Sequence, residues 1–155
     1  MIAYATRFGT TEKCVGTLAE LLREKNYEFK LVDLKKDKSV KLENYDLVVI
    51  RGSFLIARMN AFVKRNLNEL LNKKTAFFMC GADKDWETEI KKGFPEELLD
   101  KAVVKGYFGY ELNWDKMNPI FRKMMQKVSE TTESVPKINT GNIKNFADEI
   151  IEALS

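Results

Sequence analysis

The 155-residue chain contains no histidine. This absence excludes histidine-based catalytic triads and histidine metal ligands, and it removes the commonest general base. Its two cysteines, Cys14 and Cys80, stand far apart and form no C-x-x-C pair, so we expect free thiols without metal or dithiol chemistry. We therefore predict no metal site and no catalytic side chain, and we expect any chemistry to come from a bound cofactor.

Long apolar runs are also absent. No stretch approaches the about 18 residues that suggest a membrane-spanning helix, and the first residues lack the regions of a signal peptide. We therefore expect a cytoplasmic protein. The net charge of +3 is too small to predict nucleic-acid binding, and the length with 45% hydrophobic residues predicts one domain over 1–155.

The opening stretch, MIAYATRFGTTE, is the most informative part of the chain. The apolar run 2–5 is too short for a helix and is typical of a buried strand. From Glu12 onward, apolar residues recur at helical spacing, which predicts an amphipathic helix. These residues are Val15, Leu18, Leu21 and Leu22.

Between this strand and helix lies a loop of hydroxyl side chains around one glycine. The first amides of a helix lack internal partners and carry partial positive charge, so a phosphate can bind there. Gly9 allows close backbone approach because it has no Cβ. An ordinary capped helix, with Thr10 or Thr11 as the cap, is the alternative. The candidate phosphate-binding residues are Thr6, Arg7, Phe8, Gly9, Thr10 and Thr11.

Strands and helices alternate along the remainder of the chain. This order predicts an α/β fold in which helices cover both faces of a parallel sheet, a three-layer sandwich. An extended segment, 109–140, separates the fifth strand from the last helix. The further strands are expected at 27–34, 45–50, 75–79 and 102–108, and the helices at 57–72, 94–101, 116–129 and 142–154.

Three loops leave the carboxyl ends of strongly predicted strands, at 6–11, 51–56 and 80–86. In an open parallel sheet these ends meet at one edge, and ligands bind there beside the point where the strand order reverses. We therefore expect the three loops to form one site.

The motif T-x-x-G-x-T directly after the first strand resembles that of flavodoxins, in which this loop wraps the 5′-phosphate of FMN. The variant T-R-x-G-x-T is closest to a subgroup containing menaquinone-dependent protoporphyrinogen oxidases. The run Tyr-Asp-x-Val-Val-Ile at 45–50 and the aromatic segment 106–125 strengthen that similarity. The resemblance implies a flavodoxin-like sheet in the order 2-1-3-4-5, and FMN as the cofactor.

The same resemblance gives the other two loops a role in holding the flavin ring. Phe54 and Trp86 could instead serve packing, and Asp83 or Asp85 could cap the next helix. The implied ring contacts on one side are Ser53, Phe54, Leu55 and Ile56, and on the other Gly81, Ala82, Asp83 and Trp86.

Three functions remain open from the sequence. The first is an FMN-binding electron carrier that serves a redox partner protein or a quinone. The second is a quinone-linked flavin oxidase resembling protoporphyrinogen oxidase. The third is a binding module that keeps the fold without its cofactor.

The predicted helix 116–129 is basic and amphipathic, with Lys116, Arg122, Lys123 and Lys127 beside a methionine-rich apolar face. Such a helix can lie on an anionic membrane, which would place the protein at the inner face of the membrane. The alternative is that the apolar face packs on the domain and the charges are solvated.

Overall fold

The computed structural model of the chain describes residues 1–6, 9–37, 39–52, 57–81, 85–111, 114–129 and 136–155. Within these residues, five parallel strands form one sheet in the order β2-β1-β3-β4-β5. This confirms the parallel sheet and the strand order expected from the sequence. The strands are β1 (Ile2–Tyr4), β2 (Leu31–Asp33), β3 (Leu47–Gly52), β4 (Lys74–Met79) and β5 (Val104–Tyr107).

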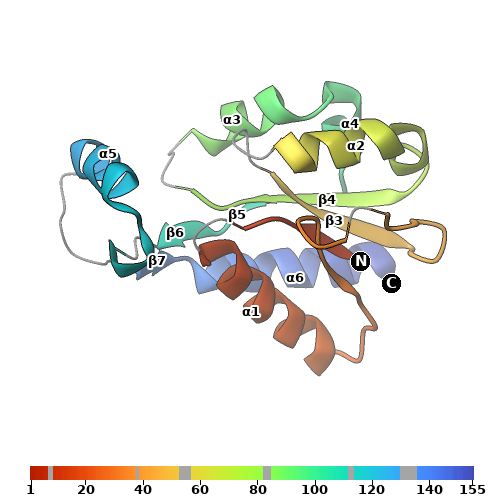
Figure 1. The fold of residues 1–155 in the computed structure, drawn as a ribbon. Helices are drawn as coiled ribbons and strands as arrows, with labels where there is room; N and C mark the ends of the chain where they lie inside the picture. Colours follow the sequence, from red (N-terminus) through yellow and green to blue (C-terminus); the bar gives the residue numbers. More distant parts are fainter. Residues whose placement is uncertain (7–8, 38, 53–56, 82–84, 112–113, 130–135) are drawn as a thin grey trace.

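Helices cover both faces of this sheet, as Figure 1 shows. One face carries α1 and α6, and the other carries α2, α3 and α4, which gives the three layers of an α/β sandwich. The helices are α1 (Thr10–Glu24), α2 (Ala57–Leu70), α3 (Trp86–Gly93), α4 (Glu96–Asp100) and α6 (Thr140–Leu154).

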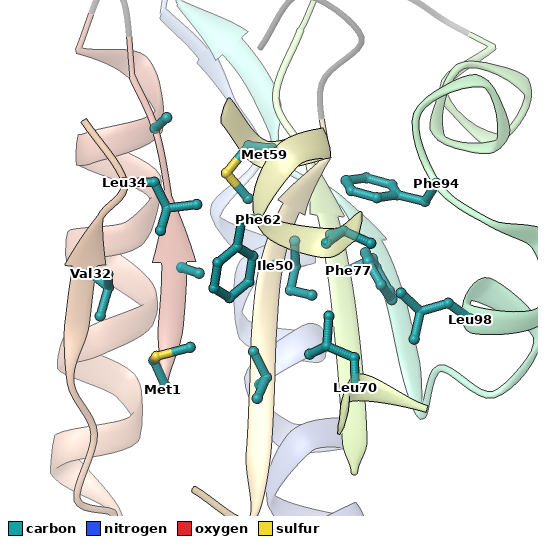
Figure 2. Close-up of a cluster of buried hydrophobic side chains, with 14 of the residues drawn as sticks. Met1, Val32, Leu34, Ile50, Met59, Phe62, Leu70, Phe77, Phe94 and Leu98 are labelled. Atoms are coloured by element: carbon teal, nitrogen blue, oxygen red, sulfur yellow. The ribbon is translucent and has the colours of Figure 1, made fainter. Parts of the chain in front are cut away.

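Each face of the sheet has its own apolar core. Side chains alternate between the faces along a strand, so the neighbours Phe77 and Phe78 of β4 enter different cores. Phe77 packs against Phe94 in the core shown in Figure 2, with the ring centroids 5.1 Å apart. On the other face, Phe78 stacks on Phe108 with the ring centroids 4.6 Å apart, and Phe146 of α6 meets Phe108 edge-on. Burial on both faces is what an interior strand requires, and β4 lies between β3 and β5.

A second, smaller sheet lies in the segment after β5. Its strands β6 (Gly109–Glu111) and β7 (Pro136–Ile138) pair antiparallel. Between them come a 3₁₀ helix, η1 (Trp114–Lys116), and α5 (Pro119–Ser129), which projects beyond the end of the sandwich in Figure 1. The sequence predicted the helix but not the hairpin, because three-residue strands are too short to show alternation.

Most element boundaries differ from the sequence prediction by a few residues, and three differences bear on the site or on the edge of the sheet. α1 begins at Thr10 rather than Glu12, so the loop before it is shorter. α3 begins at the last residue of the predicted loop 80–86 and continues through residues for which the sequence predicted no element. The edge strand β2 has three residues, because its partner β1 offers three residues for pairing.

Candidate functional site

The carboxyl end of β1 lies at the point where the strand order reverses. β1 pairs with β2 on one side and with β3 on the other, while the chain leaves it toward α1. In an open parallel sheet this geometry creates a crevice at the edge, bounded by the loops that follow the central strands. The turn from β1 to α1 therefore stands at the centre of the candidate site.

The turn is closed by Gly9, which caps α1 in a left-handed conformation with φ of 85°. A glycine offers no side chain, and no side-chain hydrogen bond caps the helix. The amides of Thr10, Thr11 and Glu12 have no partner within a helix by geometry. The alternative of a threonine cap at Thr10 or Thr11 is therefore wrong, and an anion can take the place of the missing cap.

The threonine hydroxyls of the turn differ in what they contact. Thr6 accepts a hydrogen bond from the Gly9 amide at 3.1 Å and keeps its own proton for a further acceptor. Thr10 donates its hydroxyl proton to the Glu111 carbonyl oxygen at 3.1 Å. Thr11 is 2% exposed, so its side chain is turned into the protein. Of the three, Thr6 is thus the hydroxyl left to bind a phosphate.

The second and third predicted loops fall largely outside the described residues. These positions are Ser53, Phe54, Leu55, Ile56, Ala82 and Asp83, and Arg7 and Phe8 of the first loop also lie outside. The topology alone brings their flanking residues to the same edge as Gly9, since Gly52 ends β3 and Cys80 follows β4. Their roles at a cofactor stay predictions.

Gly81 and Trp86, the described members of the third loop, are held in place by residues of β5 and β6. The Gly81 amide donates to the Gly109 carbonyl at 3.1 Å, and the Gly81 carbonyl accepts from the Tyr107 hydroxyl. Trp86 stacks on Tyr107 with the centroids 6.2 Å apart and an interplanar angle of 16°. Trp86 thus has the packing contact considered as its alternative role.

Trp86 is also the first residue of α3 rather than a loop residue. Asp85 is the cap of that helix, since its carboxylate accepts a hydrogen bond from the Thr88 amide at 3.3 Å. The sequence had left Asp83 and Asp85 open as caps, and the structure selects Asp85.

Arg51 is the residue at this edge that sequence analysis passed over. It is 9% exposed at the end of β3 and donates to the Ala5 carbonyl at 3.1 Å and to the Cys80 carbonyl at 3.4 Å. Its Nε is buried without a hydrogen-bond partner. Burial lowers the pKa of Arg51 from its ordinary value, yet a guanidinium keeps its charge. A cation inside an otherwise apolar strand was the signal that could have revealed it.

The charge balance of the described residues favours an anion at this edge. Glu111 lies beside the turn, but Lys13 neutralises it through an ion pair of 2.6 Å. Neither of the two ion pairs found among the described residues involves Arg51. The buried guanidinium therefore adds net positive charge near the start of α1, which favours anion binding.

A large open cavity of about 930 Å³ lies at the opposite edge, lined by residues such as Met1, Tyr27 and Lys74. Ligands of parallel sheets bind at the carboxyl ends of the strands, and this cavity surrounds the amino ends. We take the carboxyl edge as the site.

Among the described residues, no helix is long and apolar enough to span a membrane.

Comparison with protein families identifies one match. Residues 1–138 match the family model described as "Flavodoxin domain", which covers most of the chain and all five strands of the large sheet. No curated protein matches the sequence.

Two solved structures share the fold over nearly their whole length. A flavodoxin from Streptococcus pneumoniae TIGR4 is 14% identical, with 98% of this chain and 97% of that chain covered and a TM-score of 0.58. A short-chain flavodoxin associated with a non-canonical PDU bacterial microcompartment is 11% identical, with coverages of 99% and 97% and a TM-score of 0.59. At these identities the similarity concerns the fold alone.

Proposed function

The chain belongs to the flavodoxin domain family, whose cofactor is FMN, and on this premise we propose that it carries electrons between redox partners. One observation supports the proposal above the others: the α1 terminus at the strand reversal is capped by a left-handed glycine and by no side chain. When bound, FMN supplies one- and two-electron chemistry at its flavin ring.

The chain's own groups fit the phosphate end of FMN. The amides of Thr10, Thr11 and Glu12 would donate to the phosphate oxygens, and the hydroxyl of Thr6 would add one side-chain hydrogen bond. Arg51 beneath the turn would add positive charge without needing direct contact. In this assignment Thr10 and Thr11 bind through their backbone, because the Thr10 hydroxyl donates to Glu111 and the Thr11 side chain is buried.

The ring end of FMN would lie between the second and third loops. We propose Ser53, Phe54, Leu55 and Ile56 on one side and Gly81, Ala82 and Asp83 on the other, with Trp86 supporting the third loop through Tyr107. The part of the loop nearest to Gly81 is fixed by the two hydrogen bonds of that residue. Such fixing lowers the conformational cost of ordering the loop around a ligand.

Three single substitutions test which of the threonine hydroxyls binds the phosphate of FMN. Thr6→Ala removes a hydrogen bond to a charged group, and we expect FMN to bind about 10- to 100-fold more weakly. Thr10→Ala is the matched control, because its hydroxyl donates to Glu111, and Thr11→Val keeps the side-chain shape. Quenching of flavin fluorescence during titration measures each dissociation constant.

The opposite ranking would refute this assignment. If Thr10→Ala or Thr11→Val weakens FMN binding more than Thr6→Ala, the hydroxyls bind phosphate directly and their partners in the free protein are replaced on binding. If Thr6→Ala binds FMN as tightly as the wild type does, the Thr6 hydroxyl does not contact the phosphate.

A second candidate function is that of a quinone-linked flavin oxidase at a membrane surface. It is favoured by α5, on which Ile120 is 82% exposed and Met124 is 50% exposed, with Lys123 and Lys127 exposed on the same helix. Met125 of the same helix instead packs against the small core of Trp114 and Met117, so the apolar residues of α5 divide between packing and solvent. Arg122 donates to the Trp114 carbonyl at 2.7 Å and is therefore no solvated charge.

We expect this helix to bind anionic vesicles. Burial of two apolar side chains contributes about 1.5–3 kcal/mol each, so a double substitution, Ile120→Ser with Met124→Ser, should weaken vesicle binding at least about tenfold. Val103→Ser is the control, because Val103 is an exposed apolar residue of the sandwich. Co-sedimentation with phosphatidylglycerol vesicles at low salt measures the effect. If the wild-type protein stays in the supernatant, the membrane contact is refuted.

The oxidase activity has its own test. FMN-loaded protein is mixed with protoporphyrinogen and a water-soluble menaquinone analogue without oxygen, and the fluorescence of protoporphyrin is followed. Quinone-dependent formation of protoporphyrin would favour the oxidase, and its absence would leave the electron carrier.

A further inference from the structure

The guanidinium of Arg51 lies across the carboxyl ends of two strands. It donates to the carbonyl oxygen of Ala5, directly after β1, at 3.1 Å and to that of Cys80, directly after β4, at 3.4 Å. From these two carbonyls the chain continues into the first and third loops of the candidate site, and β3 itself leads into the second loop. The side chain of Arg51 is therefore placed at the base of all three loops.

This side chain lies on the face of the sheet that α1 and α6 cover. Side chains two residues apart on a strand share a face, and Val49 belongs to the core on the α1 side of the sheet. In Figure 1 the start of α1 and the carboxyl end of β1 lie at the same end of the sandwich. The positive charge of Arg51 is thus inside the protein, beneath the start of α1.

Within the described residues, no acidic side chain neutralises this charge. Both ion pairs found there belong to lysines, one on α1 and one on α3. Arg51 is 9% exposed, and its Nε is buried without a hydrogen-bond partner. Carbonyl oxygens carry only partial charge, so a full positive charge remains where solvent screens it weakly.

A buried cation of this kind stabilises negative charge in its neighbourhood. FMN carries negative charge on its phosphate in every state and on its flavin ring only after reduction. The attraction between Arg51 and the phosphate is the same before and after reduction, so it cancels when the two states are compared. A difference between the two states reports the ring alone.

We propose that the buried charge of Arg51 favours the reduced, anionic form of FMN and so raises the reduction potential of the bound cofactor. The oxidised ring takes two electrons from a redox partner and one proton from solvent, and it keeps one negative charge. Arg51 stays protonated throughout. This inference rests on the proposed function, because it concerns FMN in the crevice.

The effect needs no contact between Arg51 and the ring. Two unit charges roughly 12 Å apart still change an equilibrium constant about tenfold at an effective dielectric constant of about 20. Arg51→Met removes the charge, so it should weaken the binding of reduced FMN about tenfold more than the binding of oxidised FMN. A tenfold change in this ratio lowers the two-electron midpoint potential by about 30 mV.

The test compares the wild type with three variants. Fluorescence titration gives the dissociation constant of oxidised FMN, and anaerobic titration with dithionite and a redox dye gives the midpoint potential of bound FMN. Arg51→Lys keeps the charge and should restore most of the potential that Arg51→Met loses. Lys64→Met is the control, because it removes the same unit of charge from an exposed position of α2, where solvent screens it.

The pH dependence of the wild-type potential needs no variant. A buried cation near the reduced ring lowers the pKa of that ring, so the uptake of one proton per two electrons should extend to lower pH than in free FMN. In Arg51→Met the change from one to two protons should occur at a higher pH than in the wild type. The loss of two hydrogen bonds to carbonyl oxygens would not by itself move this pH.

Two results would overturn the inference: a midpoint potential that Arg51→Met leaves unchanged, and a wild-type pH dependence equal to that of free FMN. If Arg51→Met fails to fold, the wild-type pH dependence decides. A wild type that binds no FMN refutes the proposed function together with this inference. A wild type that binds FMN, with the same potential in Arg51→Met, refutes the role of Arg51 alone.

Discussion

Replacing Gly109 with alanine is expected to lower the free energy of unfolding by about 2–4 kcal/mol. Gly109 begins β6 with φ of 77°, a left-handed conformation that costs an alanine about 1–2 kcal/mol. A Cβ at this position would lie 2.1 Å from the Lys137 carbonyl oxygen, so β6 and β7 would have to separate. Urea unfolding followed by circular dichroism measures the change.

Gly16→Ala is the matched control for this substitution. Gly16 lies inside α1, and a Cβ there would meet no atom within 4 Å. Alanine in a helix interior is more stable than glycine by about 0.5–1 kcal/mol, so this variant should be as stable as the wild type or more so. If both variants unfold at the same urea concentration, the close contact at Gly109 is refuted.

The Gly109 variant also has a consequence at the candidate site. Gly109 accepts a hydrogen bond from the Gly81 amide, and Glu111, two residues further, contacts Thr10 and Lys13. Separation of the hairpin would loosen both the third loop and the start of α1. FMN affinity should therefore fall together with stability.

Replacing Gly9 with alanine is expected to weaken FMN binding by about 5- to 30-fold. Gly9 has φ of 85°, which an alanine adopts at a cost of about 1–2 kcal/mol. In the free protein the turn can relax away from this conformation, whereas the phosphate needs the amides of α1 in place. The strain of the alanine therefore lowers the affinity for FMN, which calorimetric titration measures.

Gly16→Ala again serves as the control, since it lies on the same helix two turns further along. Its affinity for FMN should equal that of the wild type. If Gly9→Ala binds FMN equally well, the conformation of the turn plays no part in binding, and the phosphate site has to be sought elsewhere.

The sequence predicted the large sheet well because its central strands are continuous apolar runs. β3 and β4 are buried on both faces, and such runs between helical patterns leave few alternatives. The strand order came from family resemblance, and the structure has the same order. The pairing of β6 with β7 was not predicted, because each strand has three residues and α5 separates the two along the chain.

The site was predicted less completely, for a physical reason. Gly9 could be placed at the turn, but which hydroxyl faces outward depends on tertiary contacts, such as that of Thr10 with Glu111. Sequence spacing says nothing of such contacts, whereas the expectation that Cys14 and Cys80 are free thiols is confirmed.

The central claim is that the phosphate of FMN binds the start of α1. It is tested most directly by comparing the dissociation constants of FMN and riboflavin, which differ by that phosphate alone. Riboflavin has no phosphate and would therefore lack several charge-assisted hydrogen bonds. We predict that FMN binds at least about 100-fold more tightly than riboflavin. Equal affinities for the two flavins, or no binding of FMN, would contradict the account.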